Sequence, residues 1–327
     1  MKRFVFLLSA IVTCAGLSLV ATRAQQAPPA SPKKPAAAPA DSQTAQTTDP
    51  SRIVYDVTRV NMLFTVQDKH GRFVTDLTRD DFEIFEKKAP QKILDFTAES
   101  DLPLRLAVLI DTSNSVRDRF KFQQEAASNF VNSIVHEKDK AIVVSFDTGA
   151  ELAADLTNDT NKLENAIRDL RPGGGTALYD AIYFACKDKL MLDQPMYKFR
   201  RAMVILSDGD DNQSHYSRDQ ALEMAQKADV VIYTISTNNS HIVTDGDKVM
   251  RYLAEQTGGT PFFPFQASDL NQSFENIANE LRHQYNLFYR PEPEHDDGQY
   301  HAVDIKVRGR KDLVVRARKG YYAKRLS

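Results

Sequence analysis

The chain has 327 residues, of which 42% are hydrophobic, and its formal net charge at pH 7 is -2. This length and composition suffice for one domain of about 200 residues and a smaller one, and they exclude a chain that is disordered throughout. The nearly neutral charge argues against a dedicated nucleic-acid-binding protein, because such proteins are usually strongly basic.

The N-terminus has the pattern of an export signal. Basic residues at the second and third positions precede an apolar stretch, Phe4 to Val20, and small residues that suit cleavage follow it up to Ala24. We therefore expect a signal peptide over residues 1–24, a periplasmic or extracellular protein, and no membrane span after cleavage. The apolar stretch is also long enough to remain as an uncleaved membrane anchor, and this alternative stays open.

The next two segments differ from each other in composition and pattern. Residues 25–51 are rich in proline, alanine, glutamine and threonine without periodicity, which is typical of a disordered linker. Residues 52–100 instead alternate apolar and polar residues, most clearly at Val60, Met62 and Phe64. This alternation predicts antiparallel strands with one buried face, in a segment too small to be stable alone.

Residues 103–284 alternate short apolar runs with stretches of helical periodicity. The runs predict buried core strands at 104–110, 141–146, 202–207 and 229–236. The helical stretches lie at about 116–134, 160–170 and 177–190, around 221–224, and at about 268–284. This alternation predicts an α/β domain, in which helices cover both faces of a mostly parallel central sheet.

Alternation of period two returns in residues 285–327. Val303, Ile305 and Val307 would share one face of a strand, with charged residues on the other face. We expect this segment to pair with residues 52–100, because neither segment could cover its apolar face alone. The two segments that flank the α/β domain would then form a small β-rich, sandwich-like domain.

Five oxygen-bearing residues lie where the chain leaves a predicted strand or enters a predicted helix. In chain order they are Asp111, Ser113, Ser115, Thr176 and Asp208. Aspartate and serine are common in turns, so each segment alone is weak evidence for a site. Together, however, they are more specific: Asp111, Ser113 and Ser115 follow one strand of the predicted parallel sheet and Asp208 follows another. Ligands of such sheets bind beyond the carboxyl ends of the strands. Thr176 also ends a glycine-rich loop and would be a good N-cap for the helix that follows.

This set of residues suits a small divalent cation. Two carboxylates and three hydroxyls are hard oxygen ligands of the kind that Mg²⁺ prefers, with Mn²⁺ or Ca²⁺ as alternatives. Because hydroxyls contribute no charge, at most two carboxylates would offset the charge of the ion. The bound ion would therefore remain electrophilic, and an Asp or Glu of a protein partner could complete its coordination.

The order of these five residues and their strand context resemble the metal-ion-dependent adhesion site (MIDAS) of von Willebrand factor type A (vWA) domains. The resemblance covers about residues 103–284 and implies a Rossmann-like fold for this part of the chain. It also implies that the two serines and the threonine bind the ion directly and that Asp208 acts through water. The first aspartate of the family pattern, here Asp111, acts directly or through water.

A finer resemblance concerns the flanking segments. The stretches "VQDKHGRFVTDLTRDDFEIFEKK" and "VVRARKGYYAK" are similar to bacterial exported proteins described as VWFA-related, of the acidobacterial type. The whole chain would then be an exported, non-enzymatic binding protein that recognises a protein ligand through the cation. We expect it to bind no nucleic acid. After signal cleavage, we also expect it to have no membrane span.

Two other functions stay open. One is a metal-dependent hydrolase or phosphotransferase on the same scaffold, although Ser113 stands where dehalogenase-like phosphatases need an acid/base aspartate. The other is a structural module for envelope assembly, in which the metal only stabilises the fold. Metal-dependent turnover of a substrate would support the first alternative. A shift of the melting temperature with Mg²⁺, without a metal-dependent partner, would support the second.

Several other polar residues have simpler interpretations. The seven histidines form no obvious ligand pair, and we interpret them as surface residues or hydrogen-bonded core residues. Asp210 and Asp211 are expected in a solvated turn, and Asp180 is expected on the exposed side of a helix. The basic stretch from Lys306 to Arg325 is typical of the solvated face of an edge strand.

Overall fold

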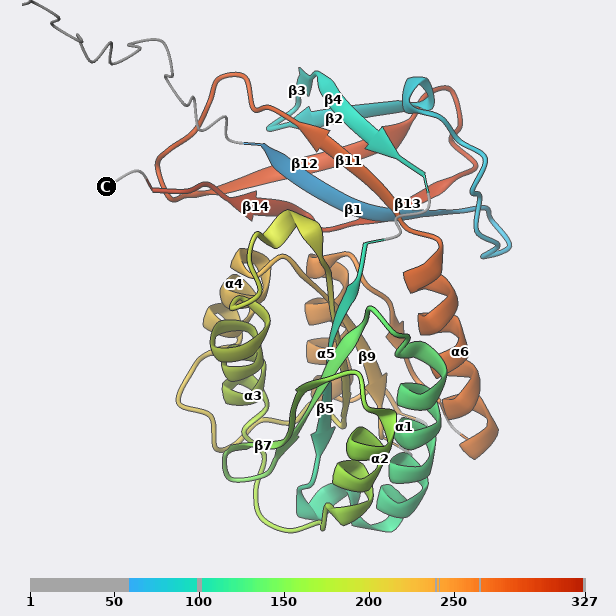
Figure 1. The fold of residues 1–327 in the computed structure, drawn as a ribbon, viewed down its shortest axis with the longest axis vertical. Helices are drawn as coiled ribbons and strands as arrows, with labels where there is room; N and C mark the ends of the chain where they lie inside the picture. Colours follow the sequence, from blue (N-terminus) through green and yellow to red (C-terminus); the bar gives the residue numbers. More distant parts are fainter. Residues whose placement is uncertain (1–58, 99–101, 239, 241, 265, 326–327) are drawn as a thin grey trace, which may run out of the picture. The chain divides into compact units, whose positions relative to one another are not determined.

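The computed structural model describes residues 59–325 apart from residues 99–101, 239, 241 and 265 (Figure 1). The predicted signal peptide (1–24), the predicted linker (25–51) and the first residues of the predicted β-rich segment lie outside the described residues.

A six-stranded sheet forms the centre of the α/β domain. Its strands are β5 (Leu104–Asp111), β6 (Lys140–Phe146), β7 (Ala150–Thr157), β8 (Arg200–Ser207), β9 (Val230–Ser236) and β10 (Pro261–Phe262). They are arranged in the order β10-β9-β8-β5-β6-β7, and all neighbours are parallel except β6 and β7. The central strands are apolar along nearly their whole length because both faces of the sheet are covered.

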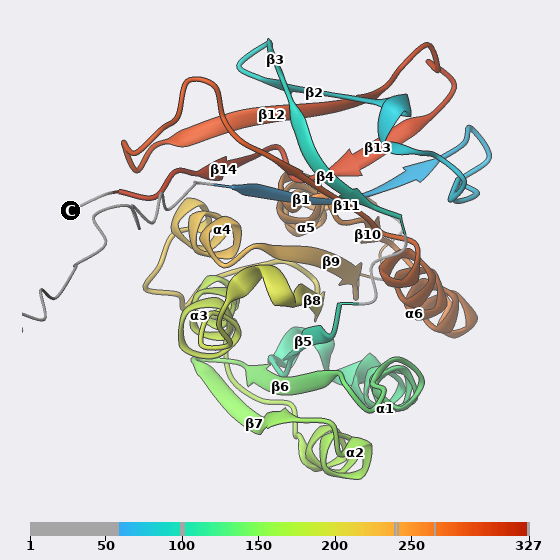
Figure 2. The same ribbon diagram turned by 45° about the horizontal axis from the view of Figure 1, so that its top comes forward.

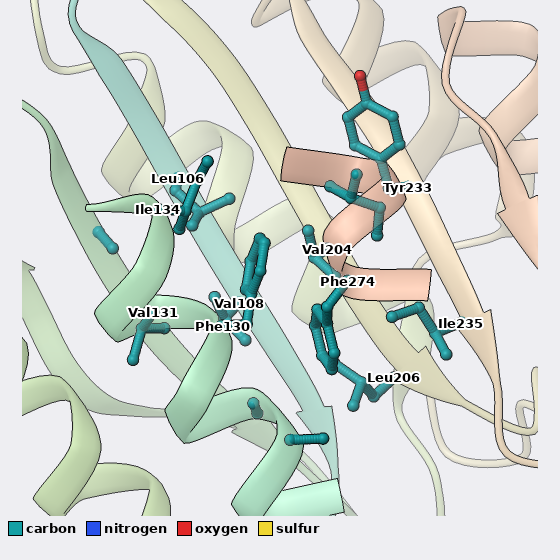
Figure 3. Packing of buried hydrophobic residues seen from close by; sticks show 14 of the residues in the cluster. Leu106, Val108, Phe130, Val131, Ile134, Val204, Leu206, Tyr233, Ile235 and Phe274 are labelled. Carbon is teal, nitrogen blue, oxygen red and sulfur yellow. The ribbon is translucent and has the colours of Figure 1, made fainter. Parts of the chain in front are cut away.

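Six α-helices cover this sheet, three on each face (Figure 2). They are α1 (Phe120–Ile134), α2 (Thr160–Asp169), α3 (Leu178–Phe184), α4 (Arg218–Lys227), α5 (Asp245–Thr257) and α6 (Ala267–Arg282). The apolar faces of α1, α2 and α6 share one core cluster, in which Phe130 and Phe274 stack with ring centroids 4.6 Å apart (Figure 3). The helices α3, α4 and α5 cover the opposite face. None of the described helices has the length and apolar character needed to cross a membrane.

The helix α5 is absent from the sequence-based prediction. It begins with a capping box, in which the Thr244 hydroxyl accepts from the Asp247 amide and the Asp247 carboxylate accepts from the Thr244 amide. It ends at Gly258, whose φ of 87° is left-handed. Both signals are local, and the buried Met250 and Leu253 mark its apolar face. The sequence therefore contained the information needed to predict this helix.

Two four-stranded antiparallel sheets form the β-rich domain. The strands are β1 (Val60–Gln67), β2 (Phe82–Glu86), β3 (Ala89–Gln91), β4 (Ile93–Thr97), β11 (Tyr285–Tyr289), β12 (Tyr300–Val307), β13 (Val314–Ala317) and β14 (Gly320–Tyr322). The sheet orders are β13-β1-β11-β4 and β14-β12-β2-β3, so each sheet combines strands from both flanking segments. Their inner faces share one apolar core. The predicted fold class, with its second domain made from both flanking segments, is confirmed.

The β-rich domain contacts the α/β domain near the amino-terminal ends of the parallel strands. Glu280, near the end of α6, accepts hydrogen bonds from Thr260 at 2.9 Å and from Thr65 of β1 at 3.4 Å. Arg318 forms an ion pair of 2.6 Å with Asp229, the residue before β9. The predicted site residues lie at the opposite edge of the sheet, beyond the carboxyl ends of the strands.

Candidate functional site

The candidate site lies at a topological switch point of the six-stranded sheet. The strand β5 is flanked by β6 on one side and by β8 on the other, so the chain leaves the two central strands in opposite directions. Ile110 of β5 is paired with Leu206 of β8, which brings the carboxyl ends of both strands to the same level. Loops beyond such ends form the crevice in which open α/β sheets bind ligands.

Asp111, Ser113 and Ser115 form one hydrogen-bonded group at the end of β5. Asp111 is fully buried, at 0% exposure, and its Oδ1 accepts a hydrogen bond of 2.8 Å from the Ser113 amide. Its Oδ2 accepts one of 2.6 Å from the Ser207 hydroxyl, at the end of β8. The Oγ atoms of Ser113 and Ser115 are 2.9 Å apart. The structure therefore brings these three predicted residues together.

The electrostatics connect Asp111 with Asp208, the residue after β8. Burial raises the pKa of the Asp111 carboxyl to about 6, and the charge of Asp208 acts in the same direction. Hydrogen bonds from Ser207 and Ser113 oppose this rise of the pKa. The Asp208 side chain is only partly buried, and its Oδ1 accepts from the Asp210 amide at 3.2 Å. A cation near both carboxylates would stabilise their charged forms, because opposite charge lowers the pKa of an acid.

Thr176 reaches the same edge of the sheet on a loop that is hydrogen-bonded on both sides. On one side, the Gly173 amide donates to the carbonyl of Thr112, in the loop after β5. On the other side, the Thr176 amide donates to Asn212 Oδ1 at 3.0 Å, and the Asn212 amide donates to the Thr176 carbonyl at 3.0 Å. Thr176 therefore lies between the loop after β5 and the loop after β8.

The prediction that Thr176 caps the next helix was wrong. The helix α3 begins at Leu178, and its N-cap position is held by Ala177, which makes no side-chain capping hydrogen bond. The loop places Thr176 one residue too early for this role, because its main chain is bonded to Asn212 instead.

The solvated interpretation of Asp180 and Asp211 was also wrong. Asp180 accepts hydrogen bonds from the amides of His215 and Tyr216, at 2.8 and 2.9 Å. Asp211 accepts from the Tyr179 amide at 3.1 Å and from the Ser214 hydroxyl at 2.6 Å. These bonds join α3 to the loop after β8, so both carboxylates help to hold the loop that follows Asp208.

Two glycines allow α5 to approach the Asp208 loop closely. A Cβ atom on Gly246, in the first turn of α5, would lie 2.1 Å from the carbonyl oxygen of Asp208. A Cβ atom on Gly209 would lie 2.3 Å from the carbonyl oxygen of Gly246, and the φ of Gly209 is +82°. Main-chain contact between these glycines therefore sets the position of the loop that carries Asp208.

The sequence analysis missed a second polar group, which lies in the β-rich domain. One potential ligand atom from each of Glu86, His295 and His301 lies within 4.8 Å of the other two. The structure therefore brings together two histidines that the sequence analysis interpreted separately, as surface or core residues. Strand alternation contained a signal, since Glu86 shares the inward face of β2 with Phe82 and Ile84.

The sequence of the α/β domain matches a known family. Residues 106–210 match the family model of the von Willebrand factor type A domain, and this range contains all five predicted site residues. The chain thus carries a von Willebrand factor type A domain, as the resemblance implied.

Individual relatives are about one quarter identical to this chain over the residues that align. Calcium-activated chloride channel regulator 1 of Bos taurus is 25% identical over 181 residues, which cover 53% of this chain and 19% of that protein. An uncharacterized protein of Borreliella burgdorferi is 26% identical over 160 residues, covering 46% and 44%. The chain therefore spans less than half of the length of either relative. A solved structure of von Willebrand factor type A from Catenulispora acidiphila has a TM-score of 0.49 and 13% identity, covering 75% of this chain and 73% of that one.

Proposed function

We propose that this chain is an exported, non-enzymatic protein that binds a protein ligand through a divalent cation. The vWA domain supports a role in protein–protein interaction, which is the typical activity of this family. The strongest support for the cation is the hydrogen-bonded group of Asp111, Ser113 and Ser115, next to a second carboxylate at the switch point. The proposal that the chain is exported is based on the signal pattern in residues 1–24. The proposed compartment is the periplasm or the extracellular space.

The residues proposed to hold the ion are Asp111, Ser113, Ser115, Thr176 and Asp208, with Asp208 acting through water. Mg²⁺ suits this set, and Mn²⁺ or Ca²⁺ are alternatives, because all the donors are oxygens. The ion would supply an electrophilic position that a carboxylate of the protein ligand could occupy. The buried Asp111 would in turn gain a positive partner for a charge that burial disfavours.

The donor set argues against hydrolysis or phosphoryl transfer. A second acid/base carboxylate is expected two residues after a nucleophilic aspartate in dehalogenase-like phosphatases, but Ser113 occupies this position and its hydroxyl contacts Ser115. Metal-dependent turnover of phosphate or ester substrates, lost in Asp111→Ala, would favour the enzymatic alternative. Stabilisation by Mg²⁺ without a metal-dependent partner would favour the structural alternative.

A metal-dependent pull-down tests the proposal. The bait is the chain without its predicted signal peptide, used in Mg²⁺ and in EDTA on envelope and extracellular fractions. We expect a partner that is retained in Mg²⁺ and lost both in EDTA and in Asp111→Ala. Asp210→Ala is the matched control, because this exposed carboxylate lies in the same loop outside the proposed ligand set. Identical profiles in all samples would contradict the proposal.

Gly246→Ala is expected to disturb the site without changing any proposed ligand. Its Cβ would lie 2.1 Å from the Asp208 carbonyl oxygen, so the loop must move. We expect a loss of about 1–3 kcal/mol in the free energy of unfolding and a weaker affinity for Mg²⁺, measured by urea denaturation and by calorimetry. Gly149→Ala is the control, because nothing lies within 4 Å of a Cβ there. Equal Mg²⁺ affinity in the two variants would show that this contact does not position the site.

A further inference from the structure

Three potential metal ligands meet in the β-rich domain, apart from the loops of the vWA site. Glu86 ends β2, His301 lies in β12, and His295 lies in the loop between β11 and β12. Glu86 Oε1 is 3.0 Å from His295 Nε2 and 3.0 Å from His301 Nδ1. We propose that these three side chains bind Zn²⁺, or a transition-metal ion of similar chemistry, independently of the vWA site.

The separations of Glu86 Oε1 from the two histidine nitrogens suit such an ion. Zinc binds imidazole nitrogen and carboxylate oxygen at about 2.0–2.1 Å, so the ligand atoms of a tetrahedral site lie about 3.3 Å apart. The two separations of 3.0 Å from Glu86 Oε1 require only a small outward movement to admit the ion. A set of two neutral nitrogens and one carboxylate favours the binding of zinc over that of magnesium. This set leaves one coordination position open.

His301 gives an independent indication that a ligand belongs here. Its side chain is 0% exposed, and its Nδ1 has no hydrogen-bond partner among the described residues. Glu86 Oε1 lies 3.0 Å from this nitrogen, but the two atoms are not aligned as in a hydrogen bond. A buried polar atom without a partner costs free energy. A cation bound between Nδ1 and the carboxylate would remove this cost.

The groups around the cluster hold its ligands in the required orientation. His301 Nε2 lies 3.1 and 3.3 Å from the two carboxylate oxygens of Asp297. A proton on Nε2 directed at this carboxylate leaves the Nδ1 lone pair facing the cluster, which is the usual arrangement of a metal-binding histidine. The Tyr289 hydroxyl donates to Glu86 Oε2 at 2.8 Å, so Oε1 remains directed at the two imidazoles.

The cluster is also accessible from solvent. The His295 side chain is 20% exposed, whereas Glu86 and His301 are almost completely buried. An ion could therefore enter on the side of His295. Once bound, it would connect the end of β2 with the loop before β12, two segments more than 200 residues apart in the chain.

An ion pair without metal is the alternative explanation. A buried carboxylate needs a positive partner, and a protonated His295 or His301 could serve Glu86 in this way. The two explanations predict different responses to zinc. If the three side chains form only an ion pair, we expect no stoichiometric zinc binding. Direct titration with Zn²⁺ therefore distinguishes the two explanations.

Calorimetric titration of the EDTA-treated, dialysed chain with ZnCl₂ tests the proposal. We expect about one Zn²⁺ per chain and a higher melting temperature of the zinc-bound protein, because metal binding to the native state stabilises it. Asp111→Ala should bind zinc equally, which separates this site from the proposed vWA site. Failure of this proposal would therefore leave the proposed function untouched, and the reverse also holds.

Variants identify the ligands. His295→Ala changes a partly exposed side chain, and Glu86→Gln keeps the shape of a buried one. We expect both to lose stoichiometric zinc binding. Asp297→Asn should weaken zinc binding by about 10–100-fold, the usual effect of changing a residue that orients a metal-binding histidine. His70→Ala, an exposed histidine elsewhere in the β-rich domain, is the matched control and should bind as the unmodified chain does. Absence of stoichiometric binding to the unmodified chain, or unchanged binding to both His295→Ala and Glu86→Gln, would overturn the proposal.

Discussion

Replacing Asp111 by asparagine is expected to remove a pH-dependent loss of stability from the metal-free protein. Burial raises the pKa of Asp111 from 3.8 to about 6 in the native state. Between these two pH values the native state holds a proton that the unfolded state has released. The free energy of unfolding of the metal-free protein should therefore fall as the pH rises from about 4 to about 6 and remain at the lower value above that. A shift of about two pKa units corresponds to about 3 kcal/mol.

Urea denaturation in EDTA, repeated across this pH range, measures the effect as the difference between the unmodified chain and Asp111→Asn. The difference should grow in favour of asparagine as the pH rises. Saturating Mg²⁺ should cancel the loss in the unmodified chain, because a bound cation stabilises the carboxylate. Asp188→Asn is the control, since Asp188 is exposed on another part of the domain. A pH-independent difference between Asp111→Asn and the unmodified chain would contradict this assignment of the buried charge.

Replacing Arg201 by methionine is expected to cost about 3–5 kcal/mol of stability, because it leaves several buried acceptors without a donor. The Arg201 side chain, near the start of β8, is 1% exposed. Its guanidinium donates to three carbonyl oxygens, those of Leu190, Asp193 and Met196, at 2.8, 2.6 and 2.7 Å. These bonds hold the segment between the end of α3 and β8, so the loss should be a global loss of stability.

Urea denaturation monitored by circular dichroism measures this loss. Arg218→Met is the matched control, because Arg218 is 42% exposed and forms a surface ion pair with Asp219. Such pairs contribute about 0–1 kcal/mol. A loss below 1 kcal/mol in Arg201→Met would mean that water replaces the guanidinium at the three carbonyls.

Much of the fold could be predicted because its signals are local. The core strands β5, β6, β8 and β9 lie in continuous apolar runs, and the alternation in β12 lies in a single segment. The order of strand, turn and helix around Asp111 and Asp208 then placed both residues at the carboxyl ends of parallel strands. The helix α5 was missed although its capping box and its terminal glycine are equally local.

Roles that depend on contacts between distant segments could not be predicted in the same way. Asp180 and Asp211 look like ordinary helix and turn residues, and only the packing of α3 against the loop after β8 gives their carboxylates amide partners. The prediction that Thr176 is an N-cap was wrong because its main-chain amide donates a hydrogen bond to Asn212, which lies in another loop.

The amino-acid sequence by itself determined the α/β class, the vWA resemblance and the five candidate ligands, because hydrophobic periodicity and strand-end motifs act within a few residues. Only the tertiary structure decided that Glu86 and His301 meet. Their strands pair antiparallel, with Ile84 opposite Ile305, and this register places both polar side chains inside the β-rich core. Alternation states which face of a strand a residue occupies, but the neighbour across the sheet depends on how distant segments pair.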